Sequence, residues 1–225
     1  MPILSALTAM TLALLILALS GAPTARAAGL LLHGAAGSVF AITETLTRAT
    51  PLILTGLAAA VAFRVKLWNI GAEGQLYAGA LAATAVGTGL VTLPPLLMIP
   101  LVCIAGAAAG ALALLGPVLL KARFSVDEVV TTLLLNFIIL LFVQMMLEGP
   151  MKDPMGMGWP QTSPIIDEGV LPRLIGQMRL HGGIVIALMA TVFVHVLMTR
   201  TVTGFEMRAV GGNASAARFA GIPVT

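Results

Sequence analysis

Residues 74–120 of the chain, GQLYAGALAATAVGTGLVTLPPLLMIPLVCIAGAAAGALALLGPVLL, contain no charged side chain. A helix that crosses the hydrocarbon layer of a membrane, which is about 30 Å thick, needs about 20 apolar residues. This run is therefore too long for one crossing, and Pro94 with Pro95 lies where a tight turn would divide it. The stretch predicts two spans, Gln75 to Val91 and Leu96 to Leu120, and hence a membrane protein that crosses more than once.

The composition of the whole chain agrees with this class. Of its 225 residues, 59% are hydrophobic and 9% are charged, whereas soluble domains average about 45–50% and about 25%. So few charged side chains cannot cover a soluble surface, which excludes soluble enzymes. A net charge of +3 is too small to indicate a nucleic-acid-binding surface, so we expect no nucleic-acid partner.

Three classes of chemical site are missing from the sequence. No Gly-Lys pair occurs, so the chain has no P-loop with which to hydrolyse ATP itself. Cys103 is the single cysteine, which excludes an intrachain disulfide and a zinc cluster built on cysteines. The three histidines are scattered, and no spacing suits a zinc-binding helix. We therefore expect no catalytic residue, metal or cofactor.

Apolar runs before residue 74 add to the predicted spans. Ile3 to Ala22 is interpreted as an uncleaved first span within residues 1–22, although Ala25-Arg26-Ala27 has the form of a signal-peptide cleavage site. Leu30 to Thr43 and Ala49 to Phe63 are each too short for a straight crossing and are separated by Glu44 and Arg48. We expect one of these two runs to be a half-helix or a tilted span.

Two spans of ordinary length follow residue 120, namely Val129 to Leu147 and Gly182 to Thr199. The predicted fold is therefore all-α, a single polytopic transmembrane bundle over residues 1–225 with about six spans or half-spans. Because the chain stops in a polar segment without a further span, we expect it to be incomplete at its C-terminus.

One predicted span carries a pattern of small residues. Gly106 and Gly110, within Leu96 to Leu120, have the small-xxx-small spacing that lets a second helix approach closely in lipid. The alanine-rich composition of this chain explains the same pattern equally well, so both interpretations stay open.

Lysine and arginine residues set the orientation of the spans, because cytoplasmic loops carry more of them. The side expected to be cytoplasmic holds Arg64, Lys66, Lys121, Arg123, Arg200, Arg208 and Arg218. The other side holds fewer basic residues in longer loops, namely Arg26, Arg48, Lys152, Arg173 and Arg179. Residues 148–181 then form an extracytoplasmic loop, long enough to be a binding surface, and residues 200–225 are cytoplasmic.

Polar residues mark the span that begins near residue 129. Ser125 and Glu128 have the spacing of a capping box, so Asp127 and Glu128 are expected to stabilise the helix start rather than relay protons. Asn136 would lie roughly 16 Å beyond Ser125, near the middle of the membrane. A buried amide there needs a partner, and a neighbouring helix and a passing substrate are both open.

A polar, glycine-rich segment, NIGAEGQ at residues 69–75, stands at the entrance of an apolar span. Irregular backbone at membrane depth is tolerated only where it is buried in protein or lines a cavity. Asn69 can cap the next helix while Glu73 complements its first turn. Lining of a pore by Asn69, Glu73 and Gln75 is the alternative.

The stretch Thr201 to Ile222 predicts a short cytoplasmic helix. Gly211-Gly212 can end one helical piece, and Asn213 can cap a second one that is closed by Gly221. This second helix would run from Ala214 to Phe219. An exposed arginine and aromatic suit docking into a groove of a partner, whereas a plain connector between spans explains the same residues equally well.

Five segments, in this order along the chain, resemble the permease subunits of bacterial ABC importers. Within that superfamily they are similar to the nucleoside and simple-sugar branch, of the branched-chain amino acid/ribose type. The segments are PLILTGL (51–57), NIGAEGQ (69–75), DEVVTTLLLN (127–136), EGPMKDP (148–154) and RAVGGNASAARFAGI (208–222). The likeness runs from about Gly37 to the end of the chain.

The resemblance implies partners and site residues. Such a permease pairs with a second permease subunit, as a homo- or heterodimer, in the bacterial cytoplasmic (inner) membrane. Two ABC ATPase subunits supply energy and an extracytoplasmic substrate-binding protein delivers cargo. The implied substrate path includes Asn69, Glu73, Gln75 and Asn136. The implied ATPase-coupling residues are Arg208, Gly211, Asn213, Ala216, Ala217, Arg218, Phe219 and Gly221.

The expected function is therefore import of a neutral polar molecule, with nucleosides ahead of simple sugars, because no charged residue is forced into the centre of a span. An ion-coupled secondary transporter is the alternative, but it would want a midplane carboxylate or inverted repeats, and neither is visible. A membrane scaffold would explain the spans and leave the segment Arg208 to Ile222 without a role.

Overall fold

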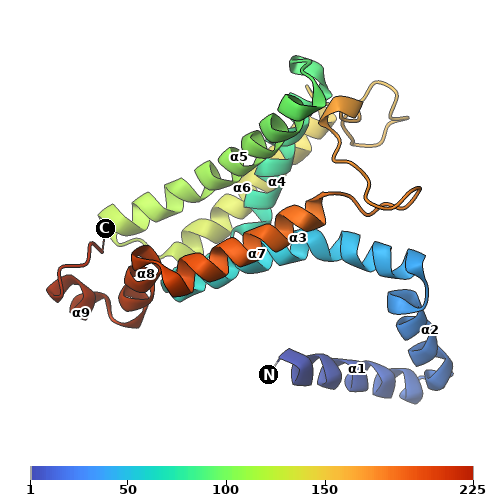
Figure 1. Ribbon diagram of the computed structural model, residues 1–225, viewed down its shortest axis with the longest axis horizontal. Coiled ribbons are helices and arrows are strands. Elements are labelled where there is room, and N and C mark those ends of the chain that lie inside the picture. The colour runs from blue at the N-terminus through green and yellow to red at the C-terminus, as the bar shows by residue number, and fades with distance from the viewer. Residues whose placement is uncertain (1, 225) are drawn as a thin grey trace. The chain divides into compact units, whose positions relative to one another are not determined.

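The computed structural model describes residues 2–224, and these residues form helices joined by short connections and one long loop (Figure 1). No β-strand occurs among them, and the predicted all-α class is confirmed. In chain order the helices are α1 (Pro2–Leu19), α2 (Thr24–Ala36), α3 (Val39–Arg64), α4 (Ala72–Ala85), the π-helix η1 (Val86–Leu90), α5 (Pro95–Phe124), α6 (Glu128–Glu148), the 3-10 helix η2 (Asp167–Gly169), α7 (Gly183–Arg200), α8 (Val202–Gly212) and α9 (Ala214–Phe219).

The chain divides into two compact units. The first contains residues 2–50 together with Arg173–Ile184, and the second contains Pro51–Pro172 together with residues 185–224. The second unit holds α4, α5, α6, α8 and α9, and it contains most of the residues singled out from the sequence.

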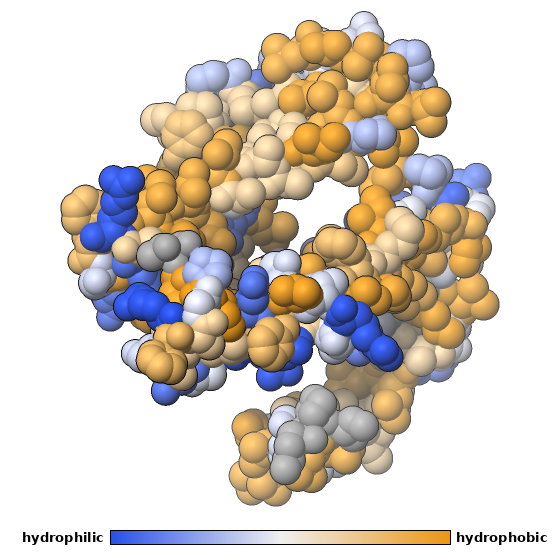
Figure 2. All heavy atoms as spheres, turned by 60° about the vertical axis from the view of Figure 1, so that its left-hand side comes forward, coloured by the Kyte–Doolittle hydropathy of each residue, from blue (hydrophilic) through white to orange (hydrophobic). Residues whose placement is uncertain are grey.

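Four of the described helices, α3, α5, α6 and α7, are long and apolar enough to cross a membrane. The apolar part of α1, Leu4–Leu19, is shorter. The long uncharged run is divided as expected, because α4 continues into η1 and α5 begins at Pro95. Figure 2 shows broad apolar areas with polar residues in small groups, which is the surface that a membrane, rather than water, covers.

The division into separate runs, Leu30 to Thr43 and Ala49 to Phe63, does not match the helices. Glu44 and Arg48 both lie inside α3, which runs without interruption from Val39 to Arg64, and the chain is instead interrupted between α2 and α3. The hydroxyl of Ser38 accepts a hydrogen bond from the N–H of Ala41 at 3.0 Å and so caps the start of α3. Glu44 and Arg48 are four residues apart on one helical face, where opposite charges support the helix.

Glycines bring α4 and α5 into close contact within the second unit. A Cβ atom added at Gly106 would lie 3.2 Å from the carbonyl oxygen of Gly79, and one added at Gly110 would lie 3.2 Å from that of Gln75. The pattern formed by Gly106 and Gly110 therefore serves close helix packing, which decides between the two interpretations left open above.

Replacing Gly79 by alanine should destabilise this contact, because the new Cβ would lie 2.8 Å from the carbonyl oxygen of Gly106. Overpacking of this kind costs about 1–3 kcal/mol. The measurement is thermal unfolding of the purified protein in detergent. Gly116→Ala in α5 is the matched control, because nothing lies within 4 Å of a Cβ added there. Equal melting temperatures for the two variants would contradict the packing assignment.

The part of the long loop between α6 and α7 that contains η2 packs against other elements of the second unit. The N–H of Ile166 donates to the carbonyl oxygen of Gly87 at 2.9 Å. A Cβ added at Gly169 would lie 3.7 Å from side-chain atoms of both Met98 and Val102. This part of the loop therefore packs on η1 and on the first turns of α5.

Candidate functional site

A stripe of three polar side chains runs along α6. Glu128, Thr132 and Asn136 are spaced four residues apart, so they share one face of the helix, and all three are buried. Buried polar groups require hydrogen-bond partners. Glu128 and Asn136 were singled out from the sequence but Thr132 was missed, although its spacing of four residues from each of them is visible there.

The partners of this stripe are backbone N–H groups in the connection between α3 and α4 and in the first turn of α4. The carboxylate of Glu128 accepts from Trp68 N at 3.3 Å, and the hydroxyl of Thr132 accepts from Ile70 N at 3.2 Å. The Asn136 Oδ1 atom accepts from Gly74 N. The stripe thus satisfies N–H groups of the non-helical connection and of the first turn of α4, which has no earlier helical turn to supply acceptors.

Two amide side chains form reciprocal hydrogen bonds across the segment of residues 69–75. Asn69 Nδ2 donates to Gln75 Oε1 at 3.0 Å, and Gln75 Nε2 donates back to Asn69 Oδ1 at 3.1 Å. Asn69 Oδ1 also accepts from Gly71 N at 3.0 Å. The N-cap position of α4 is Gly71 rather than Asn69, because Asn69 lies two residues earlier and braces the turn that leads into the helix.

Glycines let this segment lie directly on α6. A Cβ added at Gly71 would lie 2.7 Å from the carbonyl oxygen of Thr132, and one added at Gly74 would lie 2.8 Å from Asn136 Oδ1. These contacts satisfy the packing interpretation of the segment. Lining of a substrate path by the same residues stays a prediction.

Some polar groups in this region are still available to a ligand. Among the described residues, Asn136 Nδ2 has no hydrogen-bond partner and Glu73 forms neither a hydrogen bond nor an ion pair. Glu73 is exposed in the first turn of α4, where its charge complements the helix dipole. The structure therefore brings Asn69, Gln75 and Asn136 together around the start of α4, and it leaves Glu73 on the surface beside them.

The expected capping box at the start of α6 is wrong. Ser125 instead ends α5 in a left-handed conformation, with φ of 54°. The N-cap of α6 is Asp127, which accepts from Val129 N at 2.8 Å. Glu128 is turned toward Lys121, with which it forms a hydrogen-bonded ion pair. The ion pair with Lys121 forms in place of the capping box because a buried carboxylate gains more from a cation than from an exposed backbone N–H.

The segment after α7 forms the two helices that the sequence predicted. Gly212 is the last residue of α8, and α9 runs from Ala214 to Phe219. The Asn213 side chain accepts from Ser215 N at 3.0 Å and from Ala216 N at 3.1 Å, which is the expected cap. Gly221 follows with φ of 82°, a conformation that closes helices and favours glycine.

The implied coupling residues divide into an exposed set and a buried set. Phe219 is 97% exposed and Arg218 is also exposed, so both are free to contact a partner. Ala217 and Gly211 are buried within the chain, and the guanidinium atom Nη1 of Arg208 is buried without a hydrogen-bond partner among the described residues. The remaining members, Asn213, Ala216 and Gly221, are exposed.

Glycines seat α8 on the ends of two long helices. Gly204 and Gly211 are seven residues apart and therefore lie on one face of α8. A Cβ added at Gly204 would overlap the carbonyl oxygen of Leu197 near the end of α7. A Cβ added at Gly211 would overlap the carbonyl oxygen of Arg64, the last residue of α3.

Basic residues that were assigned to one side of the membrane also meet at one end of the second unit. Lys121 Nζ lies 3.5 Å from the carbonyl oxygen of Lys66, which joins the end of α5 to the connection after α3. The contact between Gly211 and Arg64 brings α8 to the same place. These contacts bring together the ends of α3 and α5 and helix α8; the side of the membrane on which they lie stays a prediction.

Comparison with known proteins identifies the family of this chain and several relatives. Residues 41–225 match the family described as the permease component of branched-chain amino acid transport systems. The chain is 41% identical to the glucose ABC transporter permease of Haloferax volcanii over 82% of its length, and 37% identical to the guanosine ABC transporter permease of Bacillus subtilis over 99%. It is 38% identical to the nucleoside ABC transporter permease of Lactococcus lactis subsp. cremoris over 84%.

The matched relatives are longer than this chain. The chain spans 51% of the Haloferax protein, 64% of the Bacillus protein and 54% of the Lactococcus protein. No solved structure shows significant similarity to the chain.

Proposed function

Because the chain belongs to the family of permease components of branched-chain amino acid transport systems, we propose that it is the membrane subunit of an ATP-driven importer for nucleosides or simple sugars. The observation that carries the cargo assignment is the shared chemistry of three relatives, whose names specify guanosine, nucleosides and glucose. All of these are uncharged molecules rich in hydroxyl groups. Nucleosides stand first because the similarity to the guanosine permease covers 99% of the chain.

The proposed subunit works with partners in the bacterial cytoplasmic membrane. A second permease subunit completes the path, cytoplasmic ABC ATPase subunits supply the energy, and an extracytoplasmic binding protein delivers the cargo. Asn69, Gln75 and Asn136 contribute amide groups to that path. Amides suit such a cargo because they both donate and accept hydrogen bonds without adding a charge to the membrane interior.

The cargo is tested by uptake in cells that express the full-length permease with its ATPase and binding protein. We expect uptake of labelled guanosine and uridine that depends on the ATPase and that unlabelled guanosine inhibits. Labelled glucose and ribose are the comparison. Uptake of the sugars alone would assign the importer to simple sugars. If neither nucleosides nor sugars are taken up, the proposed function is overturned.

Helix α9 is expected to dock on the ATPase through Arg218 and Phe219. Replacing both by alanine removes a charge and an exposed aromatic without disturbing the Asn213 cap, so co-purification of the ATPase should fall at least tenfold while the permease still enters the membrane. Ser215→Ala, on the exposed surface of the same helix, is the control and should leave co-purification unchanged. An intact complex in the double variant would contradict the coupling role.

The proposed orientation is open to labelling of single cysteines in a Cys103→Ala background. A cysteine at Trp159, in the extracytoplasmic loop, should react with a membrane-impermeant maleimide in whole cells. A cysteine at Arg123, at the end of α5, should react only after the cells are opened. The reverse pattern would invert the topology.

A further inference from the structure

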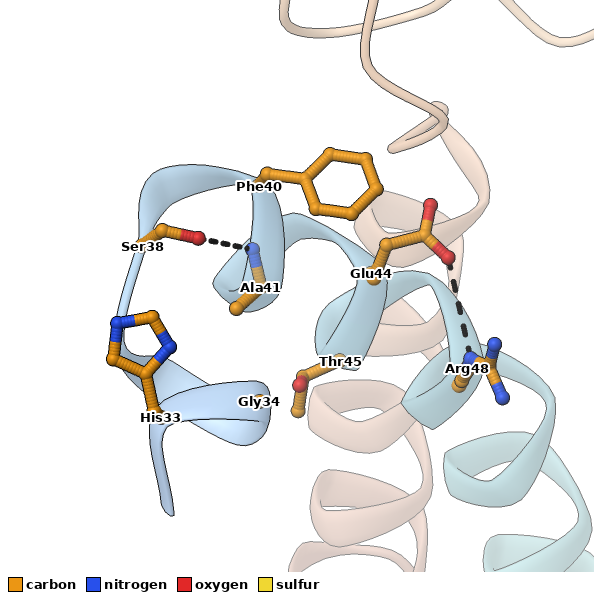
Figure 3. Close-up of a pocket in the computed structure, with 8 residues that line it drawn as sticks. All are labelled: His33, Gly34, Ser38, Phe40, Ala41, Glu44, Thr45 and Arg48. Carbon is orange, nitrogen blue, oxygen red and sulfur yellow. Dashed lines mark hydrogen bonds and ion pairs between the residues drawn. The ribbon is translucent and has the colours of Figure 1, made fainter. Parts of the chain in front are cut away.

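A pocket of about 590 Å³ lies in the first unit, between the end of α2 and the first turns of α3 (Figure 3). Pockets that hold small molecules usually have volumes of about 300–1,000 Å³. Its lining includes His33 and Gly34 from α2, and Phe40, Glu44 and Arg48 from α3. None of these residues was assigned a functional role from the sequence.

Three of the lining residues form a stripe on α3. Phe40, Glu44 and Arg48 are four residues apart, so the helix presents an aromatic ring, a carboxylate and a guanidinium on one face. Figure 3 shows the three side chains along the same stretch of helix. Phe40 is 61% exposed, which leaves its ring available to a flat or apolar surface of a ligand.

Glu44 is the least satisfied group in this stripe. Its Oε2 atom lies 3.6 Å from Arg179 Nη1 and 4.0 Å from Arg48 Nε, and its side chain is only 17% exposed. Its Oε1 atom is buried and has no hydrogen-bond partner among the described residues. An unsatisfied buried acceptor is costly, so this oxygen would gain from a hydrogen-bond donor that a ligand supplies.

Glu44 lies in the second turn of α3, beside Arg48 and Arg179, which the orientation prediction places outside the cytoplasm. The arginine side chains beside Glu44 are well exposed, 80% for Arg48 and 73% for Arg179. They therefore balance the charge of Glu44 while leaving one carboxylate oxygen for a further hydrogen-bond donor.

We propose that this pocket is a contact site for the cargo, in which Glu44 accepts a hydrogen bond from a hydroxyl or amino group and Phe40 packs against the adjoining ring. The ligand class is a neutral molecule of nucleoside or sugar size. Rotation about the terminal bond of the Glu44 side chain, which is broad in its preferences, brings the unused oxygen to the ligand. The assignment rests on the proposed function and adds to it a site distinct from the amide cluster at α4.

Protection of a reporter cysteine tests the site in the full-length importer. Gly34 lines the pocket, and nothing lies within 4 Å of a Cβ added there, so Gly34→Cys in a Cys103→Ala background should fold normally. Gly29→Cys is the matched control, because it lies on the same helix, is equally open and does not line the pocket. Guanosine and glucose are the two probes. Each is tested for its ability to protect the cysteine from alkylation by N-ethylmaleimide.

We expect the transported probe to slow alkylation at Gly34→Cys at least fivefold and to leave Gly29→Cys unaffected. Glu44→Leu, which removes the acceptor, should raise the half-protecting concentration at least tenfold. Glu44→Gln keeps one acceptor and should retain most of the protection, whereas a role in ion pairing alone would make it as damaging as leucine. Glu148→Gln at the exposed end of α6 is the control for a lost carboxylate elsewhere.

Two results overturn the site while leaving the proposed function intact. One is uptake of guanosine or glucose by the Gly34→Cys importer without protection of the cysteine by that same molecule. The other is protection that Glu44→Leu and Phe40→Ala leave unchanged. Loss of uptake for both cargo classes in the unmodified importer instead overturns the proposed function, and the cargo assignment of the pocket with it.

Discussion

Replacing Gly211 by alanine is expected to lower, at least tenfold, the coupling between this chain and the ATPase subunits proposed above. The added Cβ would overlap the carbonyl oxygen of Arg64 and would lie 3.2 Å from the Cα atom of Val65. These are backbone atoms at the end of α3, which cannot rotate away as a flexible side chain can. Helix α8 must therefore leave its seat, and α9, which follows it after one residue, must move with it.

The neighbouring glycine provides the control for this prediction. Nothing lies within 4 Å of a Cβ added at Gly212, which is exposed. We expect Gly211→Ala to lower ATPase co-purification and nucleoside uptake at least tenfold, while Gly212→Ala behaves like the parent protein. Both are measured on membranes that contain equal amounts of permease. Normal coupling in Gly211→Ala would show that the contact between α8 and the end of α3 does not position α9.

Replacing Asn136 by leucine should produce the second large effect. The change leaves Gly74 N without its acceptor, and a buried unsatisfied N–H costs about 1–3 kcal/mol. The first turn of α4 then loses its tie to α6, so we expect a lower melting temperature and a lower yield of assembled permease. Gln144→Leu, an exposed amide on the same helix, is the control and should change neither.

Uptake per mole of assembled permease separates the two roles of Asn136. Its free Nδ2 atom is proposed to face the substrate path, so uptake by the complexes that do assemble should fall at least tenfold. Unchanged uptake per complex, together with a lower yield, would limit Asn136 to holding α4. Normal yield with normal uptake would contradict both roles.

Local patterns were sufficient for much of the architecture. The uncharged run of residues 74–120 predicted two helices with a turn at Pro94, and the structure has this division. The Asn213 cap and the short helix after it were also predicted correctly. In both cases the interactions join residues close together in the sequence, so spacing alone reveals them.

Pairings between residues of different elements were not predicted. The capping box expected at Ser125 and Glu128 was displaced by the ion pair of Glu128 with Lys121 and by the bond from Trp68 N. The two apolar runs that Glu44 and Arg48 were expected to separate share one helix in part, because Glu44 is accommodated inside α3 with Arg179 beside it. Spacing along one helix carries no information about which distant group will satisfy a buried carboxylate.

By itself, the sequence determined that this is an all-α membrane protein, because the free energy of placing apolar residues in lipid depends on composition and run length, which are local properties. The tertiary structure alone decided which polar groups meet. Hydrogen-bond partners of Asn136 and Thr132 come from residues 70–74, about 60 positions earlier, and only packing of α4 against α6 brings them together. Backbone groups inside a membrane must find such partners within the protein, since lipid offers none.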